Sequence, residues 1–262
     1  MAKNIIVAYS RKQSPAHFQA VELLKTLAEY KNVAFRLADE LEQKDFADRD
    51  LAIALGGDGT FLRASHFINN GIGLLGINSE PGESEGALTP VHYDDIAAIS
   101  AILAGEYSEV FRQRAEVTLN GAKLAELALN EVYVGAEHQY TSSRYSIEFC
   151  GNRESQRTSG VLIATGSGSN AWFSSAGGEP FDYDKKRLAF KVREPYTGKR
   201  IFKPKILEGI IGENQSIVFE SERHNGGILA IDGLAAYDFN NGDRAEIKLS
   251  DNPLRVIIPK EK

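Results

Sequence analysis

Residues 56–60 read Gly-Gly-Asp-Gly-Thr and directly follow an apolar run, Leu-Ala-Ile-Ala-Leu, at residues 51–55. The run is typical of a buried strand, and residues 60–69 have a helical pattern. Glycines between a strand and a helix let the backbone approach a ligand, and N–H groups at a helix N-terminus bind phosphate. Asp58 adds a carboxylate to these groups, which indicates a general base or an indirect Mg²⁺ contact. The alternative is an ordinary Asp-Gly turn in which Thr60 caps the helix.

The first hundred residues alternate between strand and helix patterns. Strand candidates lie at 4–10, 33–37, 50–55 and 73–78, and helix candidates lie at 15–30, 60–69 and 93–103. Near-continuous apolar strands separated by helices are typical of a parallel sheet that is covered on both faces. We therefore predict an α/β N-terminal domain with a parallel sheet over residues 1–105, to which the segment 246–262 can return.

The pattern changes after Gly105. Segments of alternating polarity replace the helices at 116–119, 126–134, 143–149, 188–192 and 216–220. Turn signals such as Asn120-Gly121 separate these segments. A mostly antiparallel β domain is therefore predicted over residues 106–245.

Composition excludes several classes of protein. The chain has 262 residues, 42% of them hydrophobic and 25% charged, and a formal net charge of −6. These are globular values, and the acidity argues against generic binding to nucleic acid or to an anionic membrane. The single cysteine, Cys150, excludes an intrachain disulfide and fits a reducing cytoplasm, where we expect the protein to act. The five histidines show no metal-site spacing, so no resident metal is predicted.

The chain resembles the NAD kinase and diacylglycerol kinase superfamily, and most of all the divergent mitochondrial type of NAD kinase. Besides residues 56–60, the resemblance rests on Gly-Ile-Asn-Ser-Glu-Pro at 76–81, Arg-Gln-Arg at 112–114, Leu-Asn-Glu at 129–131, Thr-Ser-Gly at 158–160, Thr-Gly-Ser-Gly-Ser at 165–169, Ala-Trp at 171–172, Arg-Glu-Pro at 193–195 and Ile-Asp-Gly at 231–233. Ser159 stands where most members have an aspartate.

The resemblance implies an α/β domain and a β-rich dinucleotide-binding domain with the active site in the cleft. It also implies an ATP-dependent NAD kinase, which phosphorylates the 2′-hydroxyl of the adenosine ribose of NAD to form NADP. The expected partners are NAD and ATP with Mg²⁺, without nucleic acid or membrane, and the expected assembly is a homodimer or a tetramer. The alternatives are a related small-molecule or lipid kinase and a non-catalytic nucleotide-binding protein. The phosphoryl donor and the choice between NAD and NADH stay open.

The same resemblance assigns roles to individual residues. Asp58 is the expected catalytic residue, beside the 2′-hydroxyl whose proton it helps to remove. Asn130 and Glu131 are expected to hydrogen-bond the ribose and adenine, and Ser159 is expected near the nicotinamide carboxamide. The other residues expected to bind substrate or nucleotide are Gly57, Gly59, Thr60, Phe61, Asn78, Arg157, Thr165, Ser167, Asn170, Ala171, Trp172 and Ser175.

Three of these features have a plainer interpretation, and so does a basic stretch of the chain at residues 185–205. Trp172 stacks on adenine or is a large core anchor. Arg157 contacts the dinucleotide pyrophosphate or is a solvated charge at a strand end. The loop 165–170 approaches a ligand or is an ordinary mobile loop. Residues 185–205 hold nine basic residues and one acid, and they form a solvated hairpin face or a patch for polyphosphate or for an acidic neighbouring subunit.

Overall fold

The computed structural model describes residues 4–12, 14–29, 31–69, 71–198, 200–201 and 203–260. The chain divides into two compact units, one formed by residues 1–111 with 254–262 and the other by residues 112–253. We call them unit 1 and unit 2. The chain therefore passes from one unit to the other after Phe111 and after Pro253, whereas the sequence analysis placed these boundaries after residues 105 and 245.

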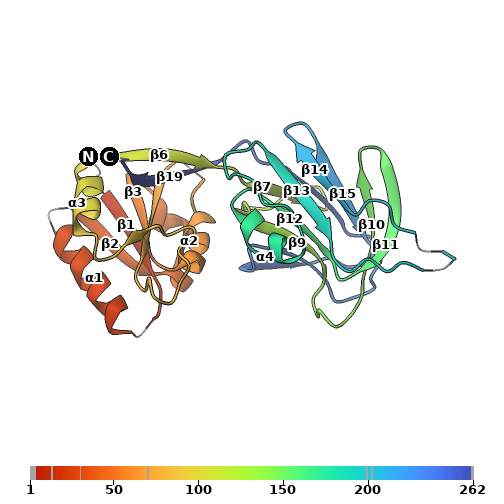
Figure 1. Ribbon diagram of the computed structural model, residues 1–262, viewed down its shortest axis with the longest axis horizontal. Coiled ribbons are helices and arrows are strands. Elements are labelled where there is room, and N and C mark those ends of the chain that lie inside the picture. Colours follow the sequence, from red (N-terminus) through yellow and green to blue (C-terminus); the bar gives the residue numbers. More distant parts are fainter. Residues whose placement is uncertain are drawn as a thin grey trace. The chain divides into compact units, whose positions relative to one another are not determined.

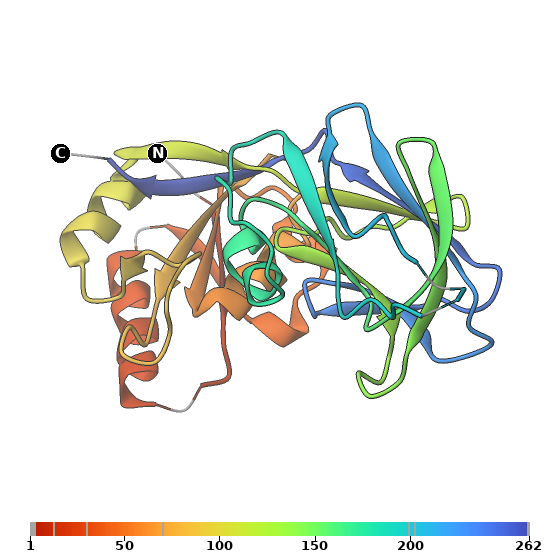
Figure 2. The ribbon, with the colours of Figure 1, turned by 45° about the vertical axis from the view of Figure 1, so that its right-hand side comes forward.

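Unit 1 is built on a mainly parallel sheet (Figure 1). Its strands are β1 (Asn4–Tyr9), β2 (Asn32–Leu37), β3 (Leu51–Gly56), β4 (Gly73–Asn78), β5 (Val91–His92), β6 (Tyr107–Arg112) and β19 (Leu254–Pro259). The order is β2-β1-β3-β4-β19-β6, with β5 paired to β4. Figure 2 shows β19 beside β6, so the last strand of the chain returns to the sheet that the first strand begins.

Three helices cover this sheet. They are α1 (Pro15–Leu27), α2 (Asp58–Ser65) and α3 (Ile96–Ala104), and short 3₁₀ turns lie at Ala38–Glu40 and Gln43–Phe46. Helices α1 and α3 share an apolar core with β1, β3 and β4, and α2 lies on the opposite face (Figure 1). The Ser14 hydroxyl caps α1 by accepting from the His17 N–H at 3.2 Å. The predicted helix end at Tyr30 lies outside the described residues.

The start of α2 corrects one alternative from the sequence. The helix begins at Asp58 and its N-cap is Gly57, so the interpretation in which Thr60 caps the helix is wrong. Thr60 is the third residue of α2 and is buried. A Cβ built at Gly56 would collide with the Thr60 hydroxyl, which explains why the turn between β3 and α2 needs a glycine there.

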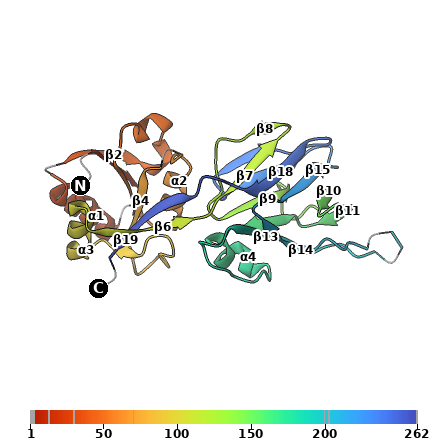
Figure 3. The same cartoon turned by 90° about the horizontal axis from the view of Figure 1, so that it is seen from above.

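Unit 2 holds two antiparallel sheets, whose elements are stacked in Figure 3. The first has the order β11-β10-β15-β18-β7-β8 and consists of β7 (Ala115–Leu119), β8 (Ala122–Lys123), β10 (Ser143–Phe149), β11 (Asn152–Thr158), β15 (Ser216–Ser221) and β18 (Arg244–Leu249). The second has the order β14-β13-β12-β9-β16-β17 and consists of β9 (Glu131–Ala136), β12 (Val161–Ala164), β13 (Arg187–Val192), β14 (Glu208–Gly212), β16 (Gly227–Ile231) and β17 (Ala235–Asp238). Apolar side chains from both sheets form one core, which includes Val117, Val134 and Phe219.

The second sheet also carries the short helix α4 (Trp172–Ser175), which follows a 3₁₀ turn at Gly168–Asn170. Phe173 of α4 packs on Tyr133, Leu162 and Ala189 of this sheet. The strand expected at 126–134 is wrong in its first half, because β9 begins only at Glu131. Among the described residues, no helix is long and apolar enough to cross a membrane.

Candidate functional site

The glycine-rich loop of unit 1 lies at the carboxyl edge of its parallel sheet. Gly56 at the end of β3 pairs with Asn78 at the end of β4, so the segments that follow the two strands start side by side. Thr60 is buried in the first turn of α2, and Phe61 is completely buried. A Cβ built at Gly59 would meet no atom within 4 Å. The protein's own packing therefore does not require this glycine, and the open space leaves room for a ligand.

Asn78 shapes the segment that faces the glycine-rich loop. Its side chain is buried, its Oδ1 accepts from the Glu80 N–H at 2.9 Å, and its Nδ2 donates to the Ser84 carbonyl at 3.3 Å. Gly86 has a φ of +67°, and a Cβ there would lie 2.8 Å from Asn78 Nδ2. Asn78 thus folds the loop 79–86 back toward α2. A Cβ built at Gly57 would lie 3.0 Å from Ser84 Oγ, so this loop reaches the start of α2.

Residues 87–89, which follow this loop, hold the Asp58 side chain by hydrogen bonds. Its Oδ1 accepts from the Leu88 N–H at 2.9 Å and from the Thr89 hydroxyl at 3.3 Å, and its Oδ2 accepts from the Ala87 N–H at 3.1 Å. The carboxylate therefore has a fixed orientation at the N-terminus of α2. Asp58 itself is partly exposed, as a group that exchanges a proton with a substrate must be.

In unit 2, Asp232 organises a polar corner that contains Asn130 and Glu131. Its Oδ2 accepts from the Leu129 N–H at 2.8 Å, and its Oδ1 accepts from the N–H groups of Asn130 at 2.8 Å and Glu131 at 3.0 Å. Asp232 is buried and has a φ of +51°, a conformation that aspartate tolerates better than most residues. These bonds turn the main chain before β9, which is why the strand begins at Glu131 and not earlier.

Two buried acceptor oxygens in this corner lack a hydrogen-bond donor among the described residues. They are Asn130 Oδ1 and Glu131 Oε2. Burial, together with the negative charge of Asp232, raises the pKa of Glu131 to about 7. Arg114 is also buried, which lowers its pKa to about 10, although the charge of Asp232 opposes this shift. A buried acceptor without a donor is costly, so this corner is built to receive hydrogen-bond donors.

The loop 165–170 lies against the same corner. The Thr165 hydroxyl donates to the Leu129 carbonyl, and the Thr165 N–H donates to the Asn130 carbonyl at 2.9 Å. A Cβ at Gly168 would collide with the backbone of Asn130. The structure thus brings Thr165 and Asn130 together. Ser167 accepts from Arg112 Nη1 at 3.1 Å, so the loop is held at its first residue and again at Ser167.

Trp172 lies on the surface of unit 2 next to this loop. Its ring stacks on Tyr133 at a centroid distance of 5.4 Å, and the Arg193 guanidinium lies 4.9 Å from the ring centroid. With 37% of its surface exposed, Trp172 is not a core anchor, so that alternative is wrong. The neighbouring Asn170, Ala171 and Ser175 are exposed as well.

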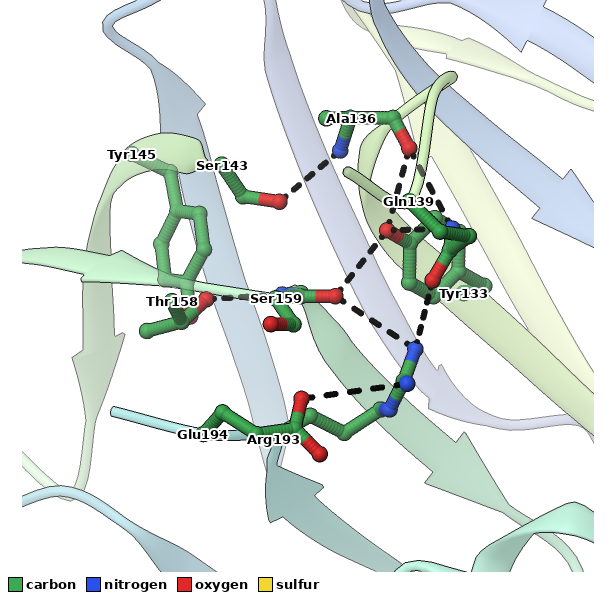
Figure 4. Close-up of polar contacts among 10 residues, drawn as sticks. Tyr133, Ala136, Gln139, Ser143, Tyr145, Thr158, Ser159, Arg193 and Glu194 are labelled. Atoms are coloured by element: carbon green, nitrogen blue, oxygen red, sulfur yellow. Dashed lines mark hydrogen bonds and ion pairs between the residues drawn. The ribbon is translucent and has the colours of Figure 1, made fainter. Parts of the chain in front are cut away.

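Tyr133 and Arg193, the two residues that contact the Trp172 ring, belong to a polar network that holds Ser159 (Figure 4). The Tyr133 hydroxyl lies 3.1 Å from the Ser159 carbonyl and 3.1 Å from the Ala136 carbonyl, between which its single proton is shared, and it accepts from Gln139 Nε2 at 3.1 Å. Arg193 Nη1 donates to Gln139 Oε1 at 2.7 Å, and the Ser159 N–H donates to the Arg193 carbonyl at 2.9 Å. Gly160, with a φ of +102°, lies on the Tyr133 ring, where a Cβ would collide. The Ser159 main chain is therefore held on both sides.

Arg157 and Ser159 share a hollow of about 370 Å³ on unit 2. Arg157 is exposed, at the end of β11, and the hollow also contains Glu194 and Tyr196. The structure thus groups Asn130, Glu131 and Thr165 in one corner, and Ser159 and Arg157 beside the Trp172 network.

Several residues that organise these sites were not among the predicted site residues. They are Thr89, Arg114, Tyr133, Arg193 and Asp232. Three of them fall within segments that carried the family resemblance, at 112–114, 193–195 and 231–233. The signal for these three was therefore present, but only the structure shows what they contact.

Comparison with known proteins identifies the family of the chain. Residues 3–107 match the family model described as ATP-NAD kinase N-terminal domain. A probable NADH kinase from Oryza sativa subsp. japonica is 30% identical, over 97% of this chain and 85% of its own length. The chain belongs to the NAD kinase family. An NAD kinase from Thermococcus gammatolerans, another relative, is 31% identical over 85% of this chain and 78% of its own length.

Solved structures show the same fold. The NAD kinase from Archaeoglobus fulgidus in complex with ATP matches with a TM-score of 0.75 and 20% identity, covering 98% of this chain and 94% of that one. The yeast NADH kinase complexed with NADH matches with a TM-score of 0.81 and 18% identity, covering 100% of this chain and 84% of that one. The predicted fold class, a parallel α/β domain followed by an antiparallel β domain, is confirmed.

Proposed function

We propose that this protein is an ATP-dependent NAD kinase, which phosphorylates the 2′-hydroxyl of the adenosine ribose of NAD or NADH. The observation that carries the proposal is that Asn130 Oδ1 and Glu131 Oε2 are buried without a hydrogen-bond donor among the described residues. The chain that holds them belongs to the NAD kinase family. Relatives named NAD kinase and NADH kinase, and neighbouring structures solved with ATP or NADH, support it.

Adenosine supplies the donors that this corner needs. Its ribose hydroxyls and its exocyclic amino group donate hydrogen bonds, and the Asn130 amide can also donate to a ring nitrogen. Each buried acceptor that finds a donor recovers roughly 1–3 kcal/mol of desolvation free energy. Glu131, whose pKa is about 7, can accept as a carboxylate or donate as a carboxylic acid near neutral pH. We therefore expect adenine and ribose to be recognised strictly.

Asp58 supplies the base. In the proposed step, Asp58 accepts the proton of the 2′-hydroxyl, and the hydroxyl oxygen forms a bond to the γ-phosphorus of ATP. The bond between that phosphorus and the β–γ bridging oxygen breaks, and its electron pair leaves with ADP. The first turn of α2 and the open space at Gly59 support a role for residues 56–60 in holding the phosphates.

Mg²⁺ enters this proposal as part of the substrate, MgATP. Within the described part of the chain, no three His, Cys, Asp or Glu side chains are grouped to hold a metal ion. Mg²⁺ in nucleotide sites is commonly bound by phosphate oxygens, waters and one or two carboxylates. The charge that it neutralises on the phosphates would assist the transfer.

The proposal also covers location and assembly. The cytoplasm fits a chain with one cysteine, and we propose a homodimer, with a tetramer as the alternative. Ion pairs between the basic stretch and acidic residues just after it, Lys186 with Glu213 at 3.4 Å and Lys191 with Glu208, support a solvated hairpin face. Lys199, in the same stretch, lies outside the described residues. Light scattering at micromolar concentration tests the assembly, and a stable monomer would contradict it.

A coupled assay tests the activity. The protein is incubated with ATP, Mg²⁺ and either NAD or NADH, and formation of NADP or NADPH is followed with a dehydrogenase that uses only the phosphorylated cofactor. Product formation that depends on ATP supports the proposal. A thermal shift with these nucleotides but no product would favour a non-catalytic nucleotide-binding protein. Phosphorylation of a lipid or another alcohol in place of NAD would favour the related kinase.

A further inference from the structure

The hydrogen bonds around Asp58 are distributed unequally over its two oxygens. Oδ1 accepts from the Leu88 N–H at 2.9 Å and from the Thr89 hydroxyl at 3.3 Å, whereas Oδ2 accepts, within the described part of the chain, only from the Ala87 N–H at 3.1 Å. An ionised carboxylate has about four acceptor positions, two on each oxygen. Both positions on Oδ1 are therefore filled, and one on Oδ2 remains.

The side chain that fills the second position on Oδ1 is the Thr89 hydroxyl. Thr89 is completely buried, so its hydroxyl has little freedom to turn away from Asp58. The two N–H groups come from the backbone and are fixed by the fold, but the hydroxyl depends on the residue at position 89. The asymmetry between the oxygens is thus set in part by one side chain.

The loop that carries Thr89 is held in place by close packing on β4. A Cβ at Gly76 would collide with the Leu88 carbonyl and would lie 2.9 Å from the Thr89 Cα. The Thr89 N–H donates to the Gly86 carbonyl at 3.2 Å, which closes a turn. Because Gly76 has no side chain, the loop lies directly on the strand and reaches Asp58.

We propose that Thr89 is a positioning residue for the phosphoryl transfer. It occupies Oδ1 of Asp58 and so directs Oδ2 toward the substrate hydroxyl, and Oδ2 is the oxygen that receives the proton. The inference rests on the proposed function, because it assumes that Asp58 is the base. It predicts that the rate of the chemical step depends on the hydroxyl at position 89 while substrate binding does not.

Two pairs of variants isolate the hydroxyl. Thr89→Val keeps the shape of the wild-type side chain and removes the hydroxyl, and Thr89→Ala differs from Thr89→Ser only by the hydroxyl. We expect kcat to fall roughly tenfold in Thr89→Val and in Thr89→Ala, as for the loss of one charge-assisted hydrogen bond. Thr89→Ser should keep at least a third of the wild-type kcat, and KM for ATP and NAD should stay within about twofold in all of them.

Ser65→Ala serves as the matched control. Ser65 is the last residue of α2 and is also completely buried, and its hydroxyl donates to the Leu62 carbonyl at 2.7 Å. Its loss should leave kcat unchanged. The Asp58→Asn background adds a second readout, because Thr89→Val should cause no further loss of kcat there if it acts through Asp58.

The outcomes separate this inference from the proposed function. If the wild-type protein forms no NADP or NADPH, the proposed function fails first. If the wild type is active and both hydroxyl-free variants keep kcat within twofold, Thr89 has no positioning role. Thr89→Ser as slow as Thr89→Ala would also overturn the inference, since packing would then be the cause. The Ser and Ala pair gives the answer even if Thr89→Val does not fold.

Discussion

Asp58 and Asp232 use the same hydrogen-bond pattern in two different settings. Asp58 accepts bonds from Ala87, Leu88 and Thr89 in unit 1, and Asp232 accepts bonds from the main chain of Leu129, Asn130 and Glu131 in unit 2. Asp58 is partly exposed at the start of a helix, whereas Asp232 is buried beside the charges of Glu131 and Arg114. Hydrogen bonds from the main chain alone therefore do not decide the role of a carboxylate. Exposure leaves Asp58 available for chemistry, and burial makes Asp232 part of the framework.

The largest expected effect comes from Asp58→Asn. The amide keeps the size of the side chain but cannot take up a proton, and positioned acid–base groups typically contribute ~10²–10⁴-fold in rate. We expect kcat to fall by about that factor while NAD binding, measured by calorimetry, stays within a few-fold. A kcat near the wild-type value would remove Asp58 from the mechanism and, with it, the contrast between the two aspartates.

Asp232→Asn should affect stability and NAD binding more than the rate of the chemical step. The asparagine can accept through one oxygen only, and its NH₂ group would face an N–H donor. We expect a loss of about 2 kcal/mol in the free energy of unfolding, and KM for NAD should rise more than kcat falls. Urea unfolding and steady-state kinetics measure the two quantities. If Asp232→Asn reduced kcat as strongly as Asp58→Asn and left stability unchanged, the division into chemistry and framework would be wrong.

The pKa of Glu131 makes stability depend on pH. Burial and the charge of Asp232 raise this pKa from 4.5 to about 7, so between these values the folded state holds a proton that the unfolded state has lost. The stabilisation is complete below pH 4.5 and is lost as the pH rises to about 7, with a slope of at most about 1.4 kcal/mol per pH unit. Glu131→Gln should lack this slope. Unfolding free energies of both proteins from pH 4.5 to 8 provide the test, and parallel curves would contradict the assignment.

The smallest expected effect concerns the nicotinamide end of the substrate. If Ser159 lies near the nicotinamide, as the family resemblance implies, a neutral hydroxyl there discriminates weakly between redox states. We expect kcat/KM for NADH within roughly tenfold of that for NAD, about 1.4 kcal/mol or less. A hypoxanthine analogue should lose more, because it leaves a buried polar group of the Asn130–Glu131 corner unpaired. Stronger rejection of NADH than of the hypoxanthine analogue would show that the role given to Ser159 is wrong.

Sequence patterns identified the parts of the fold that are apolar and local. The strands β1, β3 and β4 were predictable because both of their faces are buried, which produces uninterrupted apolar runs. Strand β11 was not predicted, because its sequence is Asn-Arg-Glu-Ser-Gln-Arg-Thr. It lies at the edge of its sheet and is fixed by pairing with β10 rather than by its own hydrophobicity.

The residues of the site also differ in how far the sequence predicts their roles. Asp58, Asn130 and Glu131 were expected as site residues because they lie in short motifs that carry the family resemblance. The roles of Asp232 and Thr89 could not be read that way, because their partners are far along the chain. Asp232 is 103 residues from Leu129, and Thr89 is 31 residues from Asp58. No local pattern reports such contacts, since the fold alone brings the partners together.

The return of β19 to unit 1 has a consequence for how the chain is made. Strand β19 lies between β4 and β6 in the sheet of unit 1, yet its residues follow the whole of unit 2 in the sequence. During translation, all of unit 2 is therefore synthesised before the internal strand that completes the sheet of unit 1. The sheet of unit 1 is completed last, although its first strand is synthesised first. Until β19 pairs, β4 and β6 have no strand between them. Deletion of a few residues at 254–259 would thus destabilise unit 1, which holds Asp58 far away in sequence, more than unit 2.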